Sequence, residues 1–132
     1  MYNNYSGLLT QTLLFTSSDV RYLKGDTTVN SGENVTLTCE LTGNSWASGV
    51  NIARSSVDSV ETIICTVNNT GGGSCNGTRI QVTGSIVDAT MTVKMYIDSA
   101  ACTDSGQYFC SPIDDDTAKA LRKMSVISKY IV

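Results

Sequence analysis

Apolar and polar residues alternate with a period of two along several short segments of this chain. In residues 34–41 every second side chain is apolar from Val35 to Leu41, and the positions between them are mostly threonine. Residues 90–97 repeat the pattern from Met91 to Ile97. Because successive side chains of a β-strand point to opposite faces of its sheet, both segments are predicted to be half-buried strands.

Six further segments are predicted to be strands from their alternation or their apolar content. They are residues 20–29, an edge segment, and residues 50–54, 60–67, 79–83, 106–110 and 123–131. Turn residues separate them, and residues 42–49 and the glycine-rich residues 68–74 are predicted to be exposed loops. Residues 114–122 have helical character but are too few for a stable helix, so they too are interpreted as a loop. Short strands at this spacing predict an all-β fold, a sandwich of two antiparallel sheets.

The composition supports one mostly β domain. The chain has 132 residues, the length of a single domain, and threonine, serine, valine, isoleucine and glycine are abundant. We expect the domain to span residues 19–132. The chain as a whole is interpreted as a piece excised from a longer protein. Residues 1–18 lack a basic leading region and a small-residue cleavage site, so we interpret them as a lead-in, either native or left from expression.

Charge and the absence of histidine exclude several classes of function. Nine basic and twelve acidic side chains give a net charge of −3, which favours neither nucleic acid nor an anionic membrane as a partner. No apolar stretch approaches the roughly eighteen residues of a membrane span, so no membrane contact is expected. The chain has no histidine, which removes the commonest general base and the histidine-dependent nucleophiles. We therefore expect no enzyme and no cofactor.

Cysteines and glycosylation sequons together predict an extracellular protein. The chain has five cysteines. Four asparagines begin an Asn-x-Ser/Thr sequon, namely Asn4, Asn34, Asn68 and Asn76. Disulfides and N-glycans both form on the secretory route, so the chain is expected to fold under oxidising conditions.

The strongest motif surrounds Cys110. Cys39 and Cys110 each lie on a predicted strand with apolar alternate residues, so a disulfide between two sheets is predicted for them. Residues 104–110 read Asp-Ser-Gly-Gln-Tyr-Phe-Cys, and residues 32–39 read Gly-Glu-Asn-Val-Thr-Leu-Thr-Cys. Both runs resemble those around the two sheet-bridging cysteines of immunoglobulin domains. The 71-residue separation resembles the variable type, V-set, which has an extra strand pair.

The resemblance implies roles for several residues. Tyr108 takes the position of the tyrosine corner, and Arg79 and Asp104 those of an ion pair that closes the base of the sandwich. Strand C is divergent, because Ile52 stands where the family has a buried tryptophan, and the chain's tryptophan, Trp46, falls in the loop before it.

Three cysteines remain for a second bridge. Cys75–Cys102 at the base of the sandwich is the favoured pairing, and Cys65–Cys75 across a hairpin is the alternative. A zinc site lacks a fourth ligand, and a catalytic cysteine lacks a histidine partner.

The missing strand-C tryptophan and the absence of a Phe-Gly-x-Gly bulge after Cys110 resemble divergent invertebrate receptors, such as the allorecognition receptors of colonial hydroids. This resemblance implies the ectodomain of a single-pass plasma-membrane receptor for adhesion or self/non-self recognition. Its partner would be a protein, including a copy of itself on an opposing cell. The alternative is a module of a secreted defence protein of the fibrinogen-related type.

The resemblance implies a binding surface on the sheet of strands G, F, C and C′ and in the loops at one end of the domain. Asp114, Asp115 and Asp116 form the acidic cluster of the chain, which lacks the spacing and turn glycine of a calcium loop and is interpreted as a solvated, partner-contacting loop. With Trp46 and the basic Lys119 and Arg122, this cluster is expected to form an antiparallel contact between two copies.

Overall fold

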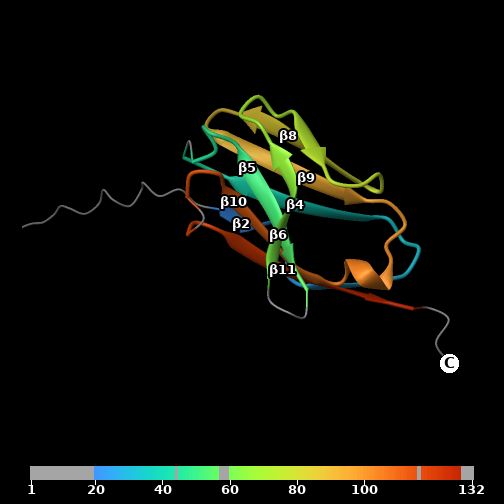
Figure 1. Cartoon of the computed structure of the whole chain (residues 1–132). Coiled ribbons are helices and arrows are strands. Elements are labelled where there is room, and N and C mark those ends of the chain that lie inside the picture. Colours follow the sequence, from blue (N-terminus) through green and yellow to red (C-terminus); the bar gives the residue numbers. More distant parts are fainter. Residues whose placement is uncertain (1–19, 44, 57–59, 116, 129–132) are drawn as a thin grey trace, which may run out of the picture.

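The computed structural model describes residues 20–43, 45–56, 60–115 and 117–128. The predicted lead-in, residues 1–18, and the sequon at Asn4 lie outside the described residues. The described strands form two sheets packed face to face (Figure 1). In order across it, the four-stranded sheet contains β2 (Val20–Tyr22), β4 (Val35–Leu41), β9 (Thr90–Ile97) and β8 (Ile80–Val87).

The second sheet has six described strands. In order across it, they are β3 (Thr27–Asn30), β11 (Ala120–Ile127), β10 (Gly106–Pro112), β5 (Val50–Ser55), β6 (Glu61–Val67) and β7 (Gly73–Cys75). This order is that of a variable-type immunoglobulin-like sandwich, with β6 and β7 as the added strand pair. The predicted all-β fold is confirmed, and the described pairs are antiparallel except β3 with β11.

The predicted edge segment 20–29 is two strands rather than one. Tyr22 of β2 pairs with Cys39 of β4, whereas Thr27 of β3 pairs with Met124 of β11, so the chain crosses from one sheet to the other. The crossing is fixed by Asp26, whose Oδ1 accepts the backbone N–H of Lys123 at 3.0 Å. Each sheet therefore gains an edge strand from this segment, which the alternation of apolar and polar residues alone predicts to be one continuous strand.

The core lies between the sheets and follows the predicted alternation. The inward side chains of β9 are 0–1 % exposed, and those of β4 are 0–7 % exposed. From the other sheet, Ile52 and Tyr108 are 2 % and 1 % exposed. Ile52 pairs with Cys110, so it occupies the divergent strand-C position beside the central disulfide.

The glycine-rich loop closes one side of the sandwich. Its third glycine, Gly73, begins β7, and the backbone N–H of Gly84 in β8 donates to the carbonyl of Gly71 at 2.8 Å. A Cβ on Gly73 would lie 2.5 Å from Val82 Cγ1 and 3.1 Å from the Val82 carbonyl oxygen. The loop is therefore not only an exposed tip, because its glycines let the edges of the two sheets approach each other.

Candidate functional site

The base of the sandwich is held by a polar cluster around Asp104. Its carboxylate accepts two hydrogen bonds from Arg79, at 3.1 Å from Nη1 and 3.0 Å from Nη2, and one from the N–H of Ala101 at 2.8 Å. The Tyr108 hydroxyl donates to the Asp104 carbonyl. Arg54 does not bond the acid, and its Nη1 donates instead to the Thr103 carbonyl at 2.8 Å. The predicted ion pair and the tyrosine corner are confirmed.

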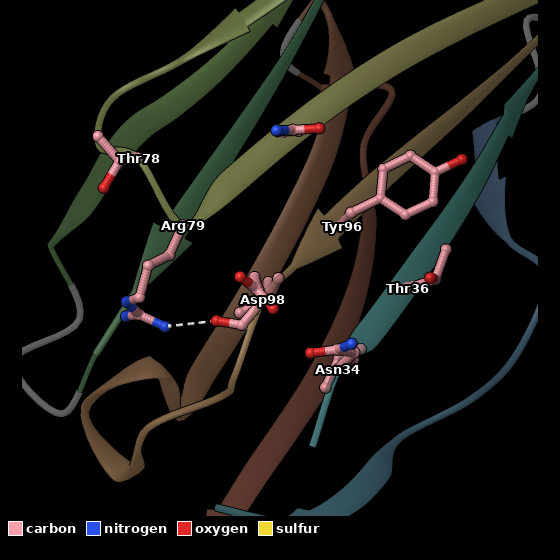
Figure 2. Close-up of a pocket in the computed structure, with 9 residues that line it drawn as sticks. Asn34, Thr36, Thr78, Arg79, Tyr96 and Asp98 are labelled. Carbon is pink, nitrogen blue, oxygen red and sulfur yellow. Dashed lines mark hydrogen bonds between the residues drawn. The ribbon is translucent and has the colours of Figure 1, made fainter. Parts of the chain in front are cut away.

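The same arginine borders a shallow hollow on the four-stranded sheet. Figure 2 shows Arg79 directed toward Asp98, whose carbonyl accepts a bond from Arg79 Nη1 at 3.1 Å. Tyr96 and Asn34 lie across the hollow from it. The polar groups of Arg79 already make hydrogen bonds at the base of the sandwich. Arg79 therefore has a structural role here.

The environment of Asp104 changes its acidity. Burial acts to raise the pKa of Asp104, but the hydrogen bonds from Arg79 and Ala101 and the charges of Arg79 and Arg54 outweigh it and lower the pKa. The carboxylate therefore stays ionised and bound to Arg79 through the physiological pH range.

The second disulfide differs from the favoured prediction. Cys39–Cys110 is present as predicted, whereas Cys75 is bonded to Cys65, and Cys102 is a free, exposed thiol. The predicted Cys75–Cys102 bridge is wrong because Cys65 of β6 and Cys75 of β7 are direct cross-strand partners, 4.0 Å apart at Cα. Two disulfides indicate an oxidising, extracellular type of environment.

Trp46 belongs to the packing of the domain. It is half-buried against the core, and its Nε1–H donates at 3.1 Å to the carbonyl of Ala89, in the turn between β8 and β9. This packing explains why a tryptophan lies in the loop just before strand C, although the family's buried tryptophan in strand C is missing. Less of the Trp46 side chain is therefore available to contact a partner than the sequence predicted.

The acidic loop is solvated and structured by its own contacts. Asp114 accepts a hydrogen bond from the Ser48 hydroxyl, and Asp115 Oδ1 accepts the N–H of Thr117 at 3.1 Å. Hydrogen bonds from the Thr117 hydroxyl and N–H lower the pKa of Asp115. Asp116 lies outside the described residues.

Arg122 does not belong to the loop surface. Strand β11 begins at Ala120, and pairing of Ala120 with Cys110 turns Arg122 inward, where it is 5 % exposed. Its Nε and the Tyr22 hydroxyl have no hydrogen-bond partner among the described residues. Burial lowers the pKa of Arg122, while the nearby Tyr22 and Asp26 act to raise it. The prediction that Arg122 binds a partner is therefore wrong for the folded domain.

An apolar row crosses the outer face of the six-stranded sheet. Phe109 of β10 pairs with Leu121 of β11 on one side and with Ala53 of β5 on the other, and Ala53 pairs with Ile63 of β6. Leu121 and Ile63 are 52 % and 51 % exposed, and Phe109 is half-buried. We call Leu121, Phe109, Ala53 and Ile63 the apolar row. The resemblance pointed to this sheet face, but sequence reasoning did not identify the residues of the row, although Phe109 precedes an inward cysteine and so had to point outward.

Charged groups border the row. Lys119 lies with its Nζ 4.8 Å from the centroid of the Phe109 ring and 2.9 Å from Glu61 Oε2. Lys119 was predicted as a binding residue, and it does lie at this surface. Lys123, two residues beyond Leu121 on β11, is exposed on the same face.

The outer face of the four-stranded sheet is different. Its exposed positions on β8 and β9 include Gln81, Thr83, Ser85 and Lys94, and an ion pair between Arg21 and Glu40 at 3.0 Å crosses from β2 to β4. On β8 and β9, the exposed large apolar side chains of this face are Tyr96, which pairs with Gln81, and Val87, which pairs with Thr90 at the other end of the strands. Of the two outer faces, that of the six-stranded sheet carries the apolar row.

The three described sequons lie at exposed asparagines. Asn34 precedes β4, and its Oδ1 accepts the N–H of Ser99 at 2.9 Å. Asn68 lies between β6 and β7, and its Oδ1 accepts from the N–H groups of Thr70 and Gly72, both at 3.0 Å. Asn76 follows β7, and its Nδ2 donates to the Ile63 carbonyl at 3.4 Å.

Comparison with family models and curated sequences adds no relative. No protein-family model matches the chain, and no curated protein matches it significantly in sequence. Within the described ranges, no helix is long and apolar enough to cross a membrane. The same residues contain no group of three or more cysteine or carboxylate side chains placed to hold a metal ion.

Proposed function

We propose that this chain is an extracellular recognition domain that binds a protein partner through the outer face of its six-stranded sheet. The observation that carries the proposal is the apolar row, which exposes about half of Leu121 and of Ile63 beside the half-buried Phe109. A contiguous apolar strip on a folded monomer is typical of an interaction site, especially when polar groups border it.

The arrangement of charge suits a protein partner. Lys119, Glu61 and Lys123 surround the row with both signs of charge, as in the polar rim of protein interfaces. The net charge of −3 does not favour a polyanionic ligand. The aromatic Phe109 at the centre is the residue type that anchors such interfaces.

Two of the three described sequons fit the same choice of face. The sequon at Asn34 borders the four-stranded sheet, beside the hollow around Tyr96. The one at Asn68 lies in the loop beyond the end of β6. Glycans at both positions would leave the apolar row open, whereas the sequon at Asn76, whose Nδ2 donates to the Ile63 carbonyl, lies beside the β6 end of the row.

The type of parent protein is part of this proposal. The Asp-x-Gly-x-Tyr-x-Cys run and the divergent strand C support a receptor ectodomain similar to the allorecognition receptors of colonial hydroids. The strand order supports membership of the variable-type immunoglobulin family. Neither the sequence motif nor the strand order involves catalysis. In this proposal the domain acts by binding a partner.

A matched pair of substitutions tests the proposed face. Tetramers of the domain are applied to beads carrying the domain and to cells of the organism that produces it. Leu121→Asp places a charge in the row and is expected to weaken the binding at least about tenfold, because an anchor position loses apolar contact and buries a charge. Val87→Asp introduces the same charge at an exposed valine of the four-stranded sheet and is expected to leave binding unchanged.

Comparing the two variants shows which outer face binds the partner. Equal binding by wild type and Leu121→Asp, or equal losses in both variants, would contradict the proposal. Circular dichroism and thermal unfolding of both variants establish that each is folded before binding is compared.

A further inference from the structure

The sequon at Asn34 lies beside an exposed aromatic ring on the outer face of the four-stranded sheet. Asn34 immediately precedes β4, and Thr36, the third residue of the sequon, belongs to β4; both are exposed. In the register of β4 with β9, Thr36 pairs with Tyr96. Tyr96 is therefore the diagonal neighbour of Asn34, a position within reach of an aromatic side chain.

The ring of Tyr96 borders the hollow already described on this face. Tyr96 is 39 % exposed, although most of the side chains around it are polar. Figure 2 shows Tyr96 and Thr36 on one side of Asn34, and Arg79 and Asp98 on the other. These five residues line a hollow of about 340 Å³, which has room for a sugar ring.

The amide of Asn34 is held in one orientation. Its Oδ1 accepts the N–H of Ser99 at 2.9 Å. Because the oxygen and nitrogen of an amide point in different directions, Nδ2 is turned away from Ser99. Nδ2 is the atom that carries an N-glycan, and it donates no hydrogen bond to any of the described residues. A glycan on Asn34 would therefore start in a direction that the protein fixes.

We infer that the glycan of Asn34 folds back onto this face and that its first N-acetylglucosamine packs on the ring of Tyr96. One face of this sugar carries C–H groups, which pack on an aromatic ring as other apolar groups do. The amide of Gln81, which pairs with Tyr96 from β8, is exposed beside the ring and is able to bond a sugar hydroxyl. The first sugar thereby becomes part of the packing of the four-stranded sheet.

This contact goes beyond the proposed function, because it lies on the outer face opposite to the apolar row. It needs only the oxidising environment that the two disulfides indicate, where N-glycans are also added. The sequon at Asn68 provides a comparison within the same chain. Asn68 lies in the loop between β6 and β7, so it has no cross-strand neighbour on a sheet face.

Removing the sequon without changing the shape of the strand tests the contact. Thr36→Val keeps a β-branched side chain but abolishes glycosylation of Asn34. Both proteins are secreted from glycosylating cells, and mass spectrometry measures the occupancy of Asn34. Wild type is expected to melt about 4 °C higher than Thr36→Val, the shift that one aromatic contact gives a domain of this length. The same two proteins made without glycans in the bacterial periplasm are expected to melt at equal temperatures.

Replacing the ring separates a contact with the sugar from a general effect of the glycan on the unfolded chain. Tyr96→Ser is introduced into wild type and into Thr36→Val, and it is expected to remove the difference in melting temperature between them. Val87→Ser, at another exposed apolar position of the same sheet, is the matched control and is expected to leave that difference unchanged. An endoglycosidase that trims the glycan to its first sugar is also expected to leave it unchanged.

Release of the glycan measures the same contact without unfolding the protein. A peptide N-glycosidase, which cleaves the bond between Nδ2 and the first sugar, is applied to the folded domain. Tyr96→Ser is expected to speed release from Asn34 about fivefold, which corresponds to the loss of one aromatic contact, and to leave release from Asn68 unchanged.

Three results would overturn the contact between the glycan and Tyr96. They are a secreted protein whose Asn34 carries no glycan, a difference in melting temperature that persists in the Tyr96→Ser pair, and equal release from Asn34 with and without the ring. None of them bears on the apolar row, whose test is the binding of Leu121→Asp.

Discussion

Asp104 connects three parts of the molecule through one side chain. Its carboxylate binds Arg79, which precedes β8, and the N–H of Ala101, while its carbonyl accepts the Tyr108 hydroxyl of β10. The side chain is 6 % exposed, so these bonds replace water that the carboxylate has lost. Hydrogen bonds to a charged group contribute more to stability than neutral ones. Asp104 is therefore expected to be a main determinant of stability at the base of the sandwich.

Replacing Asp104 by asparagine tests this role through pH. Asp104→Asn is expected to lower the free energy of unfolding by about 2 kcal/mol at pH 7, the magnitude of hydrogen bonds to a charged group. Because the folded pKa of Asp104 is lowered, its contribution is present above the unfolded value of about 3.9 and is lost as pH falls through the folded pKa. Urea unfolding should thus show a smaller difference between wild type and variant at pH 2.

Asp115→Asn is the control for this prediction, since the side chain is exposed and bonds only within its own loop. Its effect on the free energy of unfolding is expected to be small, as for other surface substitutions. An Asp104→Asn variant with wild-type stability at pH 7 would contradict the role assigned to the cluster.

At the scale of elements, the junction of β7 with β8 depends on the absence of side chains. A Cβ at Gly73 would meet Val82 Cγ1 at 2.5 Å and backbone oxygens of Val82 and Thr66 at 3.1 and 3.2 Å. Because backbone atoms lie on both sides of Gly73, β7 cannot shift to make room for a side chain there. The glycines therefore allow a close approach between the edges of the two sheets.

Substitution of one glycine tests this approach. Gly73→Ala is expected to destabilise the domain by about 2 kcal/mol, as overpacking of a close contact does. Gly25→Ala is the matched control, because a Cβ there meets nothing within 4 Å and the change is expected to be neutral or slightly stabilising. Thermal unfolding of the two variants compares them, and equal melting temperatures would contradict the close approach.

The elements also show how far the sequence predicts this structure. Alternation located β4 and β9, and the motif at Cys110 predicted the central disulfide, the ion pair and the tyrosine corner correctly. The sequence favoured Cys75–Cys102 and gave the observed Cys65–Cys75 bridge only as the alternative, because the pairing of Cys65 with Cys75 depends on the register of a three-residue strand. Arg122 was misplaced because β11 begins three residues earlier than its apolar pattern indicates. The apolar row draws on four strands, so it became visible only once their pairing was known.

At the scale of the whole molecule, the two outer faces differ in chemistry. The four-stranded sheet presents threonine, serine, glutamine and charged side chains, with the sequon of Asn34 at its margin. The six-stranded sheet presents the apolar row, with Lys119, Lys123 and Glu61 beside it. A folded domain that only spaced other domains apart would have no need of this asymmetry. This asymmetry supports the proposed recognition function.

A glycan introduced on each face in turn tests the central claim most directly. Lys123→Asn creates the sequon Asn-Met-Ser on β11, and Thr83→Asn creates Asn-Gly-Ser on β8 of the other sheet. Lys123→Gln removes the same charge without a sequon. Binding of tetramers secreted from glycosylating cells is measured for all three, after mass spectrometry has shown that the new sites are occupied. The account predicts that the Lys123→Asn glycan abolishes binding, that Lys123→Gln weakens it only in part, and that the Thr83→Asn glycan leaves it intact; full binding with the β11 glycan in place would contradict it.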